Sequence, residues 1–525
     1  MKQKLLALSL ASLLLATGCA EMGTSLPIDI PSTPTESTPA ESTPVDVSTD
    51  DTATEEVSSV LESDLVPEIF TLEDGAYDPT KEVEIKFYTT MGDSLQKIFN
   101  TYLEDFNVLY PNIKVVLDPI GGYDQVRDQI KMELATGEHP NVAYCYPDHV
   151  ALYNKAKGVY TLDSFIDSDV EIDVPELDEA TGEPKVGEDG KVIYTKERLG
   201  LSEEQKADFI EGYYNEGKQF GNGYMYTLPF SKSTEVLYYN KTFFDANNIQ
   251  VPTTWSELFT VCQQIKSIDP LSTPLGYDSE ANWFITMCEQ LGSPYTTPLG
   301  KKADHFLFNN DTNKQFIETF RQMYSLGYIT TQKIYGSYTS GLFVETDPTA
   351  NRSYMSIGSS AGATHQRPKK NDAGEYPFEV GIASIPQIDA ANGKVISQGP
   401  SVCLFKDDDP QKIIASWLLI KYFTTSIDFQ AEFSMGSGYV PVIKSVSQHP
   451  EYVKFLAGAD GGNGIAALSA KVCMEQEKYY FTSPAFLGSS AARDQVGELL
   501  VAAITETKSV DKAFEDAIAQ CIADS

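Results

Sequence analysis

After residue 80, apolar and polar residues alternate with two different periodicities, one typical of strands and one typical of helices. Val83 to Thr89 alternates with a period of two, which is typical of a half-buried β-strand. Residues 93–110 carry apolar side chains at helical spacing, and a second strand pattern follows at 113–117. A further helix at 125–136 and a third strand at 142–146 continue the series. Strands that alternate with helices form parallel βαβ units, so the pattern predicts an α/β fold.

The first eighteen residues have a different pattern, that of a signal peptide. Lys2 and Lys4 precede an apolar run from Leu5 to Leu15, which is too short to span a bilayer. The run ends in Ala16-Thr17-Gly18-Cys19, which resembles the bacterial lipobox. This resemblance implies cleavage before Cys19, acylation of its thiol and a location on the outer face of the cell membrane. An ordinary cleaved signal followed by a chance cysteine is the alternative.

Residues 19–80 are predicted to be a disordered tether between this anchor and the folded part. Lys and Arg are absent from Glu21 to Thr80, where Ser, Thr, Pro and acidic residues dominate. A segment of that composition buries too little apolar surface to offset its ordering entropy. We therefore expect the folded part to begin near Lys81.

Charge and cysteine content narrow the possible functions. The formal net charge is −36, and the folded part stays acidic without the tether, which argues against binding nucleic acid or anionic lipid. After Cys19 the cysteines are widely spaced and form no C-x-x-C pair; they are Cys145, Cys262, Cys288, Cys403, Cys473 and Cys521. A single disulfide among them is left open. The histidines show no metal-ligand spacing, and no metal or cofactor is predicted.

Several short motifs follow the predicted elements in order. They are Met91-Gly92, Gly121-Gly122-Tyr123-Asp124, the stretch from Ala135 to Val142, Tyr226-Thr227-Leu228-Pro229-Phe230, Leu237-Tyr238-Tyr239-Asn240-Lys241, Pro252-Thr253-Thr254-Trp255 and Gly438-Tyr439-Val440-Pro441-Val442. Together they cover the chain from about residue 82 to its end, and their specificity lies in their shared order. In that order they resemble the extracellular solute-binding proteins of ABC importers, the family that includes the maltodextrin- and glycerol-phosphate-binding proteins.

The resemblance implies a periplasmic-binding-protein-like fold of the class II type. Two α/β lobes, each discontinuous in sequence, would enclose a ligand cleft and be joined by crossover strands near 228–234, 385–399 and 435–441. We expect residues 81–230 and 386–435 in the N-terminal lobe, and residues 231–385 and 436–525 in the C-terminal lobe. The acidic stretch 167–218 departs from the family pattern. It contains a predicted hairpin at 183–192 and receives no function.

The resemblance also supplies most of the expected ligand-binding residues. Tyr123, Ser233, Ser359, Ser360, Gly399 and Tyr439 match positions where the glycerol-phosphate-binding relative contacts its ligand. Trp283 lies at a loop-to-helix edge where family members place a stacking aromatic ring. Tyr146 and Asp148 end the third strand, at the carboxyl edge where α/β folds bind ligands. Trp255 and Tyr238 are expected in the core instead.

These residues favour a binding protein over an enzyme. Gly358-Ser359-Ser360-Ala361-Gly362 only partly matches a nucleophile elbow and has no histidine partner recognisable from context. Asp407-Asp408-Asp409 is typical of a solvated turn and not of a glycosidase acid pair. The predicted function is therefore a monomeric receptor that captures a sugar and delivers it to an ABC permease.

A neutral mono- or oligosaccharide is favoured over a phosphorylated ligand. The segment Tyr480 to Gly488, where the glycerol-phosphate-binding relative carries an arginine, contains none. Arg493 follows and is expected to be a surface or capping residue. A glycerol-phosphate or other polyol-phosphate receptor, or a surface sensor with the same fold, remains the alternative.

Overall fold

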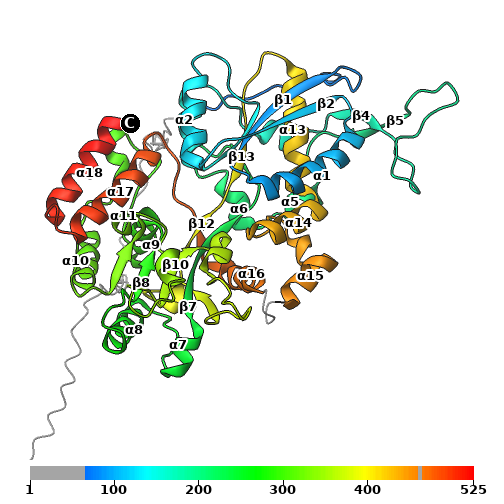
Figure 1. Ribbon diagram of the computed structural model, residues 1–525. Helices are drawn as coiled ribbons and strands as arrows, with labels where there is room; N and C mark the ends of the chain where they lie inside the picture. Colours follow the sequence, from blue (N-terminus) through cyan, green and yellow to red (C-terminus); the bar gives the residue numbers. More distant parts are fainter. Residues whose placement is uncertain (1–64, 459–463) are drawn as a thin grey trace, which may run out of the picture.

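The computed structural model describes residues 65–458 and 464–525 and contains two large sheets with helices packed around them, together with a small two-stranded sheet. Figure 1 shows one sheet among the blue and cyan elements at the upper right, and the other among the green elements at the lower left. The predicted α/β fold of two lobes is confirmed. Cys19 and the rest of the expected signal and anchor lie outside the described residues.

The first sheet has five strands, with the predicted βαβ units at one side. Their order is β2 (Ile113–Pro119), β1 (Val83–Thr89), β3 (Val142–Cys145), β13 (Ser401–Leu404) and β6 (Leu228–Pro229). β1 pairs in parallel with β2 and β3, whereas β13 runs antiparallel to β3 and β6. The connecting helices are α1 (Asp93–Leu109) and α2 (Tyr123–Glu133), close to the bounds that the apolar spacing predicts.

The second sheet has seven strands and carries the other lobe. Their order is β14 (Tyr480–Phe481), β12 (Val395–Gln398), β7 (Ser233–Asn240), β10 (Met355–Ser359), β8 (Leu275–Tyr277) and β9 (Ile329–Thr331), with β11 (Val380–Ser384) also paired to β7. β7 is buried along nearly its whole length, and its Tyr238 is a core residue as expected. Trp255, also buried, is the first residue of α8 (Trp255–Ile268). Thr254 and Glu257 form a reciprocal capping box at the N-terminus of this helix.

The remaining helices cover the faces and edges of the two sheets. Beside the first sheet lie α3 (Pro147–Lys155), α4 (Asp163–Ile166), α5 (Glu203–Asp208), α6 (Glu211–Glu216), α13 (Pro410–Thr425) and α14 (Ile427–Ser437). Around the second lie α7 (Lys241–Ala246), α9 (Glu280–Leu291), α10 (Asp311–Ser325), α11 (Gln332–Tyr335), α12 (Ser340–Phe343), α16 (Ile465–Gln476), α17 (Ser489–Ile504) and α18 (Val510–Asp524). α15 (Pro450–Ala457) packs between α14 and α16. Short 3-10 helices are η1 (Lys302–His305), η2 (Ser360–Gln366), η3 (Ala390–Asn392), η4 (Lys444–Gln448) and η6 (Glu477–Tyr479).

The chain crosses between the sheets within the first segment predicted for a crossover and at the end of the second. It passes from β6 to β7 around residue 231 and from β12 to β13 at Gly399-Pro400. The backbone N–H groups of Phe230 and Ser231 both donate to the Pro400 carbonyl, and Lys232 bridges to Val440 in the third segment. Since β12 belongs to the second sheet, the return to the first sheet falls at about residue 400. The full lobe boundaries that the sequence suggests stay a prediction.

Residues 65–80 pack against the first lobe. The tether therefore does not extend to residue 80 as predicted. Leu65 and Tyr77 are buried, and the Leu65 carbonyl accepts from the side chain of Asn222. Glu68 forms an ion pair with Lys406 at 2.7 Å. The prediction was based on the average composition of residues 21–80, which does not show that the last residues of this stretch are more apolar. Each side chain buried there offsets part of the entropy lost when the segment becomes ordered.

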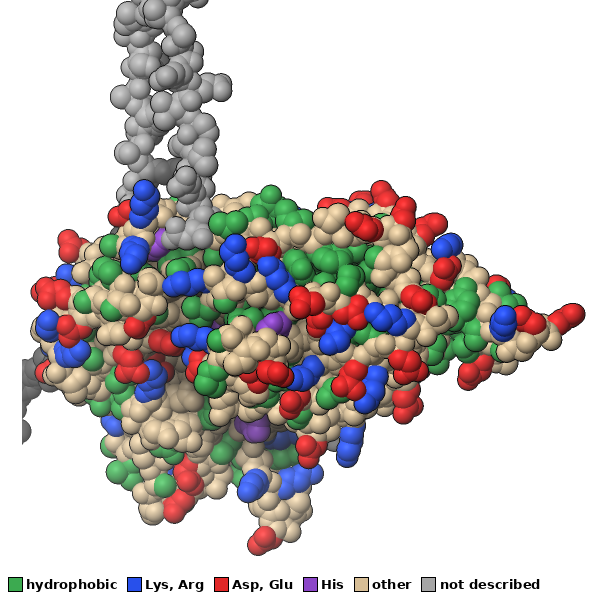
Figure 2. Space-filling view, turned by 90° about the horizontal axis from the view of Figure 1, so that it is seen from above, with side chains coloured by type: hydrophobic (Ala, Val, Ile, Leu, Met, Phe, Trp, Pro, Cys, Tyr) green, Lys and Arg blue, Asp and Glu red, His purple; other side chains and the backbone are tan. Residues whose placement is uncertain are grey.

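Residues 171–198 of the acidic insertion form an arm that stands away from the first lobe, at the right of Figures 1 and 2. Its strands β4 (Glu171–Pro175) and β5 (Tyr194–Arg198) pair antiparallel. The predicted hairpin is confirmed, because Val186 bridges to Val192 beyond the paired strands. Trp417 anchors the base of the arm by donating from its indole nitrogen to the Leu199 carbonyl at 2.9 Å.

The six cysteines after Cys19 are all buried and free. They therefore act as small apolar side chains, and the disulfide left open by the sequence is absent from the part of the chain that the structure describes. Across residues 65–458 and 464–525, none of the helices has the length and apolar content needed to cross a membrane.

Candidate ligand-binding cleft

A cavity of about 980 Å³ lies between the two lobes. Its walls come from α2 and α3 of the first lobe, from β7, β10, α9 and α17 of the second, and from the crossover segments. The side chains that contribute polar or aromatic groups include Tyr123, Arg127, Tyr146, Asp148, Glu235, Asp278, Asn282, Tyr338, Ser359, Gln366, Gln398, Tyr439 and Arg493. The cavity volume falls in the usual range for small-molecule sites.

Three of the predicted tyrosines meet in this cavity. Tyr123 begins α2, and its ring lies 4.8 Å from that of Tyr146, centroid to centroid. The Tyr123 hydroxyl lies 3.1 Å from the hydroxyl of Tyr439, which follows Gly438 in the third crossover segment. Burial raises the pKa of each of these phenols above its ordinary value, so they remain neutral donors. Aromatic faces with protonated hydroxyls can contact both the C–H groups and the oxygens of a ligand.

Asp148 and Ser359 also line the cavity as predicted. Asp148 lies in the first turn of α3, where it accepts a hydrogen bond from the backbone N–H of His149. Ser359 ends β10, and its hydroxyl caps η2 by accepting from the Ala361 backbone. The first lobe therefore contributes a carboxylate to the cavity, and the second contributes a hydroxyl.

A hydrogen-bonded network on the second-lobe wall was not predicted. Glu235 in β7 is 1% exposed and accepts from the Tyr277 hydroxyl at 2.5 Å and from the Asn282 side chain at 3.1 Å. Asn282 in turn accepts from the guanidinium of Arg493. Burial raises the pKa of Glu235 to about 7, against the effect of both hydrogen bonds. The signal that could have identified Glu235 is a single acidic residue inside the strand, directly before the apolar run from Val236 to Tyr239.

Trp283 is a correction. The expected stacking residue is fully buried, with its ring 4.7 Å from that of Tyr277 and 4.3 Å from that of Phe320. Its neighbour Asn282 lines the cleft instead. The side chains of successive helix residues point about 100° apart. The start of α9 therefore lies at the cleft as predicted, but Asn282 faces the cavity and Trp283 faces the core.

Ser233, Ser360 and Gly399 lie beside the cavity without lining it, which also departs from the expectation. Ser233 contacts Ser359, with 3.5 Å between the two hydroxyl oxygens. Ser360 is buried and accepts from the Thr234 backbone at 3.1 Å. Gly399 has φ +90, and a Cβ there would lie 2.5 Å from the Ser231 carbonyl oxygen. These residues make close contacts within the protein beside the crossover segments. From residue type alone, such a structural role cannot be distinguished from a role in ligand binding.

Arg493 is a second correction, because it lines the cleft and is not a simple surface cap. It lies one turn into α17 (Ser489–Ile504), which the chain reaches only after β14 has paired with β12. Arg127 lines the same cavity and pairs with Asp124 at 3.1 Å and with Asp128 at 2.8 Å. The expectation of a cleft without a fixed cation is therefore wrong.

Acidic groups nevertheless outnumber basic ones around the cavity. Its acidic side chains are Asp124, Asp148, Glu235, Asp278, Glu280 and Asp494, and its basic ones are Arg127, Lys333 and Arg493. Burial raises the pKa of Asp278 and Asp494, as it does that of Glu235. An anionic ligand would meet a field dominated by carboxylates, whereas a neutral ligand would find many acceptors and some donors.

Comparison with known proteins gives one family. Residues 101–456 match the family model of the bacterial extracellular solute-binding proteins. The sn-glycerol-3-phosphate-binding periplasmic protein UgpB of Yersinia pestis is 22% identical over 454 residues, which cover 83% of this chain and 90% of that protein.

Solved structures share the fold. UgpB of Mycobacterium tuberculosis in complex with glycerophosphocholine superimposes with a TM-score of 0.61 at 17% identity, covering 84% of this chain and 99% of the other. A cyclic alpha-maltosyl-1,6-maltose binding protein of Arthrobacter globiformis gives a TM-score of 0.60 at 16% identity, covering 84% and 98%.

Proposed function

The chain belongs to the bacterial extracellular solute-binding proteins, and from this premise we propose that it captures a neutral mono- or oligosaccharide and delivers it to an ABC permease. The observation that carries the proposal is the cavity between the lobes, where three tyrosines and many hydrogen-bonding side chains face one another. A sugar presents C–H faces to aromatic rings and hydroxyls to polar side chains. Closure of the lobes around it would follow from contacts with both walls.

The charge of the cleft supports a neutral ligand. Carboxylates exceed cations among the lining side chains, and Arg127 is already paired with two aspartates. A phosphorylated ligand would need to displace these pairs or be left close to uncompensated carboxylates. A neutral sugar requires neither.

Isothermal titration of the purified chain tests the proposal. We expect at least one of maltose, maltotriose, cellotriose, glucose or galactose to bind with a Kd below about 100 μM, and sn-glycerol-3-phosphate to show no heat at millimolar concentration. A saturating saccharide at 100 times its Kd should also stabilise the fold by about 2.7 kcal/mol in thermal unfolding. Binding of the phosphate alone would refute the preference for neutral sugars.

A phosphorylated polyol is the second candidate, and the place of Arg493 favours it. Its guanidinium reaches the cleft and contacts Asn282, so a bidentate donor is available on one wall. If this candidate is right, glycerol phosphate should bind tightly and Arg493→Gln should abolish that binding. Arg367→Gln, outside the cleft lining, is the matched control.

The proposal includes anchoring at Cys19 by a lipid, on the outer face of the membrane of a bacterium. Its support is the lipobox-like Ala16-Thr17-Gly18-Cys19 after a short apolar run. Labelling with an alkyne fatty acid should mark the native protein in cells and leave Cys19→Ala unmarked. Equal labelling of both proteins would refute the anchor, without affecting the proposed binding function.

A further inference from the structure

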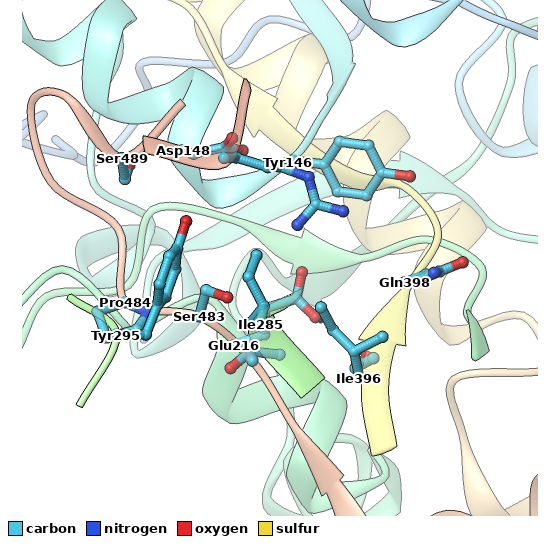
Figure 3. A pocket seen from close by; sticks show the side chains of 13 residues that line it. Tyr146, Asp148, Glu216, Ile285, Tyr295, Ile396, Gln398, Ser483, Pro484 and Ser489 are labelled. Carbon is cyan, nitrogen blue, oxygen red and sulfur yellow. Dashed lines mark hydrogen bonds between the residues drawn. The ribbon is translucent and has the colours of Figure 1, made fainter. Parts of the chain in front are cut away.

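A small side pocket of about 60 Å³ adjoins the cleft, and Figure 3 shows the side chains that line it. It shares Tyr146, Asp148, Gln398 and Arg493 with the main cavity. Its other walls come from α6, α9, β12 and the segment 482–489 that leads into α17. Because a water-sized group needs about 10–15 Å³ by this measure, the side pocket holds a few heavy atoms and not a whole sugar ring.

Two buried hydroxyls in this side pocket have no hydrogen-bond partner within the protein. Tyr295 is 6% exposed, and both its hydroxyl and that of Ser483 are buried without a partner. Figure 3 shows the phenol of Tyr295 and the hydroxyl of Ser483 among the side chains that line the pocket. Buried polar atoms in native proteins are almost always paired, so two orphans on one small pocket require an explanation.

The rest of the lining has both polar and apolar character. Ile285, Ile396 and Pro484 provide apolar surface. Asp148 can accept a hydrogen bond and Arg493 can donate one, while burial raises the pKa of Tyr295 and keeps its hydroxyl protonated. A group suited to this lining has a short apolar carbon and a terminal hydroxyl that both donates and accepts.

We infer that the side pocket binds the terminal hydroxymethyl group of a hexose, with its methylene against Ile285 and Ile396 and its hydroxyl between Tyr295 and Ser483. The inference rests on the proposed function, because it places one end of the proposed saccharide. It makes Tyr295 and Ser483 specificity-determining residues: they distinguish a hexose from the pentose of the same ring stereochemistry, which lacks only that group. A site built to hydrogen-bond a hydroxyl discriminates strongly against a ligand without it.

Calorimetry on the full chain with matched sugar pairs tests this inference. The pairs are glucose with xylose, galactose with L-arabinose, and cellotriose with xylotriose. The native protein should bind the hexose member of at least one pair about tenfold or more tightly than the pentose member. Tyr295→Phe and Ser483→Ala should each weaken hexose binding about three- to tenfold and leave pentose binding unchanged.

Two control variants remove equally unpartnered hydroxyls from outside the cleft. Tyr153→Phe and Ser353→Ala change buried hydroxyls that line neither cavity, so both should leave hexose and pentose affinities as in the native protein. Equal native affinity within every pair that binds, or an equal loss for both members in Tyr295→Phe and Ser483→Ala, would overturn the hydroxymethyl site alone. Binding of no saccharide by the native protein would overturn the proposed function, and the site with it.

Discussion

The ammonium group of Lys232 donates to the Glu216 carboxylate at 2.8 Å, with both side chains almost fully buried. Lys232 also donates to the Gly399 carbonyl at 3.2 Å and to the Ser401 hydroxyl at 3.0 Å. Its backbone pairs with that of Val440 in both directions. One residue therefore connects the three crossover segments, and the acidic insertion supplies its counter-charge through α6.

Removing one member of this pair should destabilise the fold. Lys232→Met would leave Glu216 buried without its cation, and we expect a loss of roughly 3–5 kcal/mol in the free energy of unfolding. Burial raises the pKa of Glu216 even with Lys232 in place, which indicates how costly its charge is there. Urea denaturation followed by circular dichroism measures the change.

The paired variant Lys232→Met with Glu216→Leu separates charge from packing. It should recover most of the loss, because no unpaired charge remains buried. Lys114→Met at the exposed Lys114–Glu84 pair is the control and should cost less than about 1 kcal/mol. If the single Lys232 variant is as stable as the native protein, the pair does not hold the crossover segments together.

Glu235 should make stability depend on pH between about 4.5 and 7. Burial raises the pKa of Glu235 from its ordinary value of 4.5 to about 7, so the folded protein binds this proton more tightly than the unfolded chain does. Below the lower value both states are protonated; as pH rises toward 7 the unfolded chain loses its proton first and the fold loses stability. Above the pKa of Glu235 in the folded protein, the loss in the free energy of unfolding levels off at about 3 kcal/mol.

Comparison with Glu235→Gln isolates this contribution. The difference in unfolding free energy between the native protein and Glu235→Gln should shift in favour of the glutamine as pH rises from 4.5 to 8. Glu188→Gln, exposed on the arm, should show a constant difference from the native protein. A constant difference for Glu235→Gln as well would mean that Glu235 titrates normally in the fold.

Trp283→Ala should act on stability. The ring fills the core between Tyr277 and Phe320, and its removal should cost about 3–5 kcal/mol. Trp283→Phe keeps much of that volume and should bind a saccharide ligand as the native protein does. Weaker binding by a fully folded Trp283→Phe would restore a role for this ring in the cleft.

Tyr439→Ala should weaken binding of a saccharide about three- to tenfold, because the ring lines the cleft and its hydroxyl lies beside that of Tyr123. Tyr194→Ala on the exposed arm is a matched loss of a tyrosine away from the cavity. Titration calorimetry should find native affinity for the arm variant and the loss only for Tyr439→Ala. Equal affinity in both variants would remove Tyr439 from the ligand site.

The local pattern of apolar and polar residues was sufficient to predict the first strands and helices of the fold. β1, α1, β2 and α2 appear close to their predicted bounds, because alternation and helical spacing report which face of each element is buried. Tyr123, Ser359 and Tyr439 came from the resemblance in motif order, and Tyr146 and Asp148 from the end of the third strand. All five line the cavity, and their role in ligand binding stays a prediction. Their location follows from the order of the elements.

The rest of the cleft depended on contacts between residues far apart in sequence. Arg493 reaches Asn282 across 211 positions, and Asn282 contacts Glu235 across 47. Whether Asn282 or Trp283 faces the cavity is decided by the rotation of α9 against its neighbours. By itself the sequence determined the fold class, the order of the elements and a binding role, since burial periodicity and motif order are local properties. Only the tertiary structure decided which polar side chains share the cleft, because distances across two lobes are set by packing.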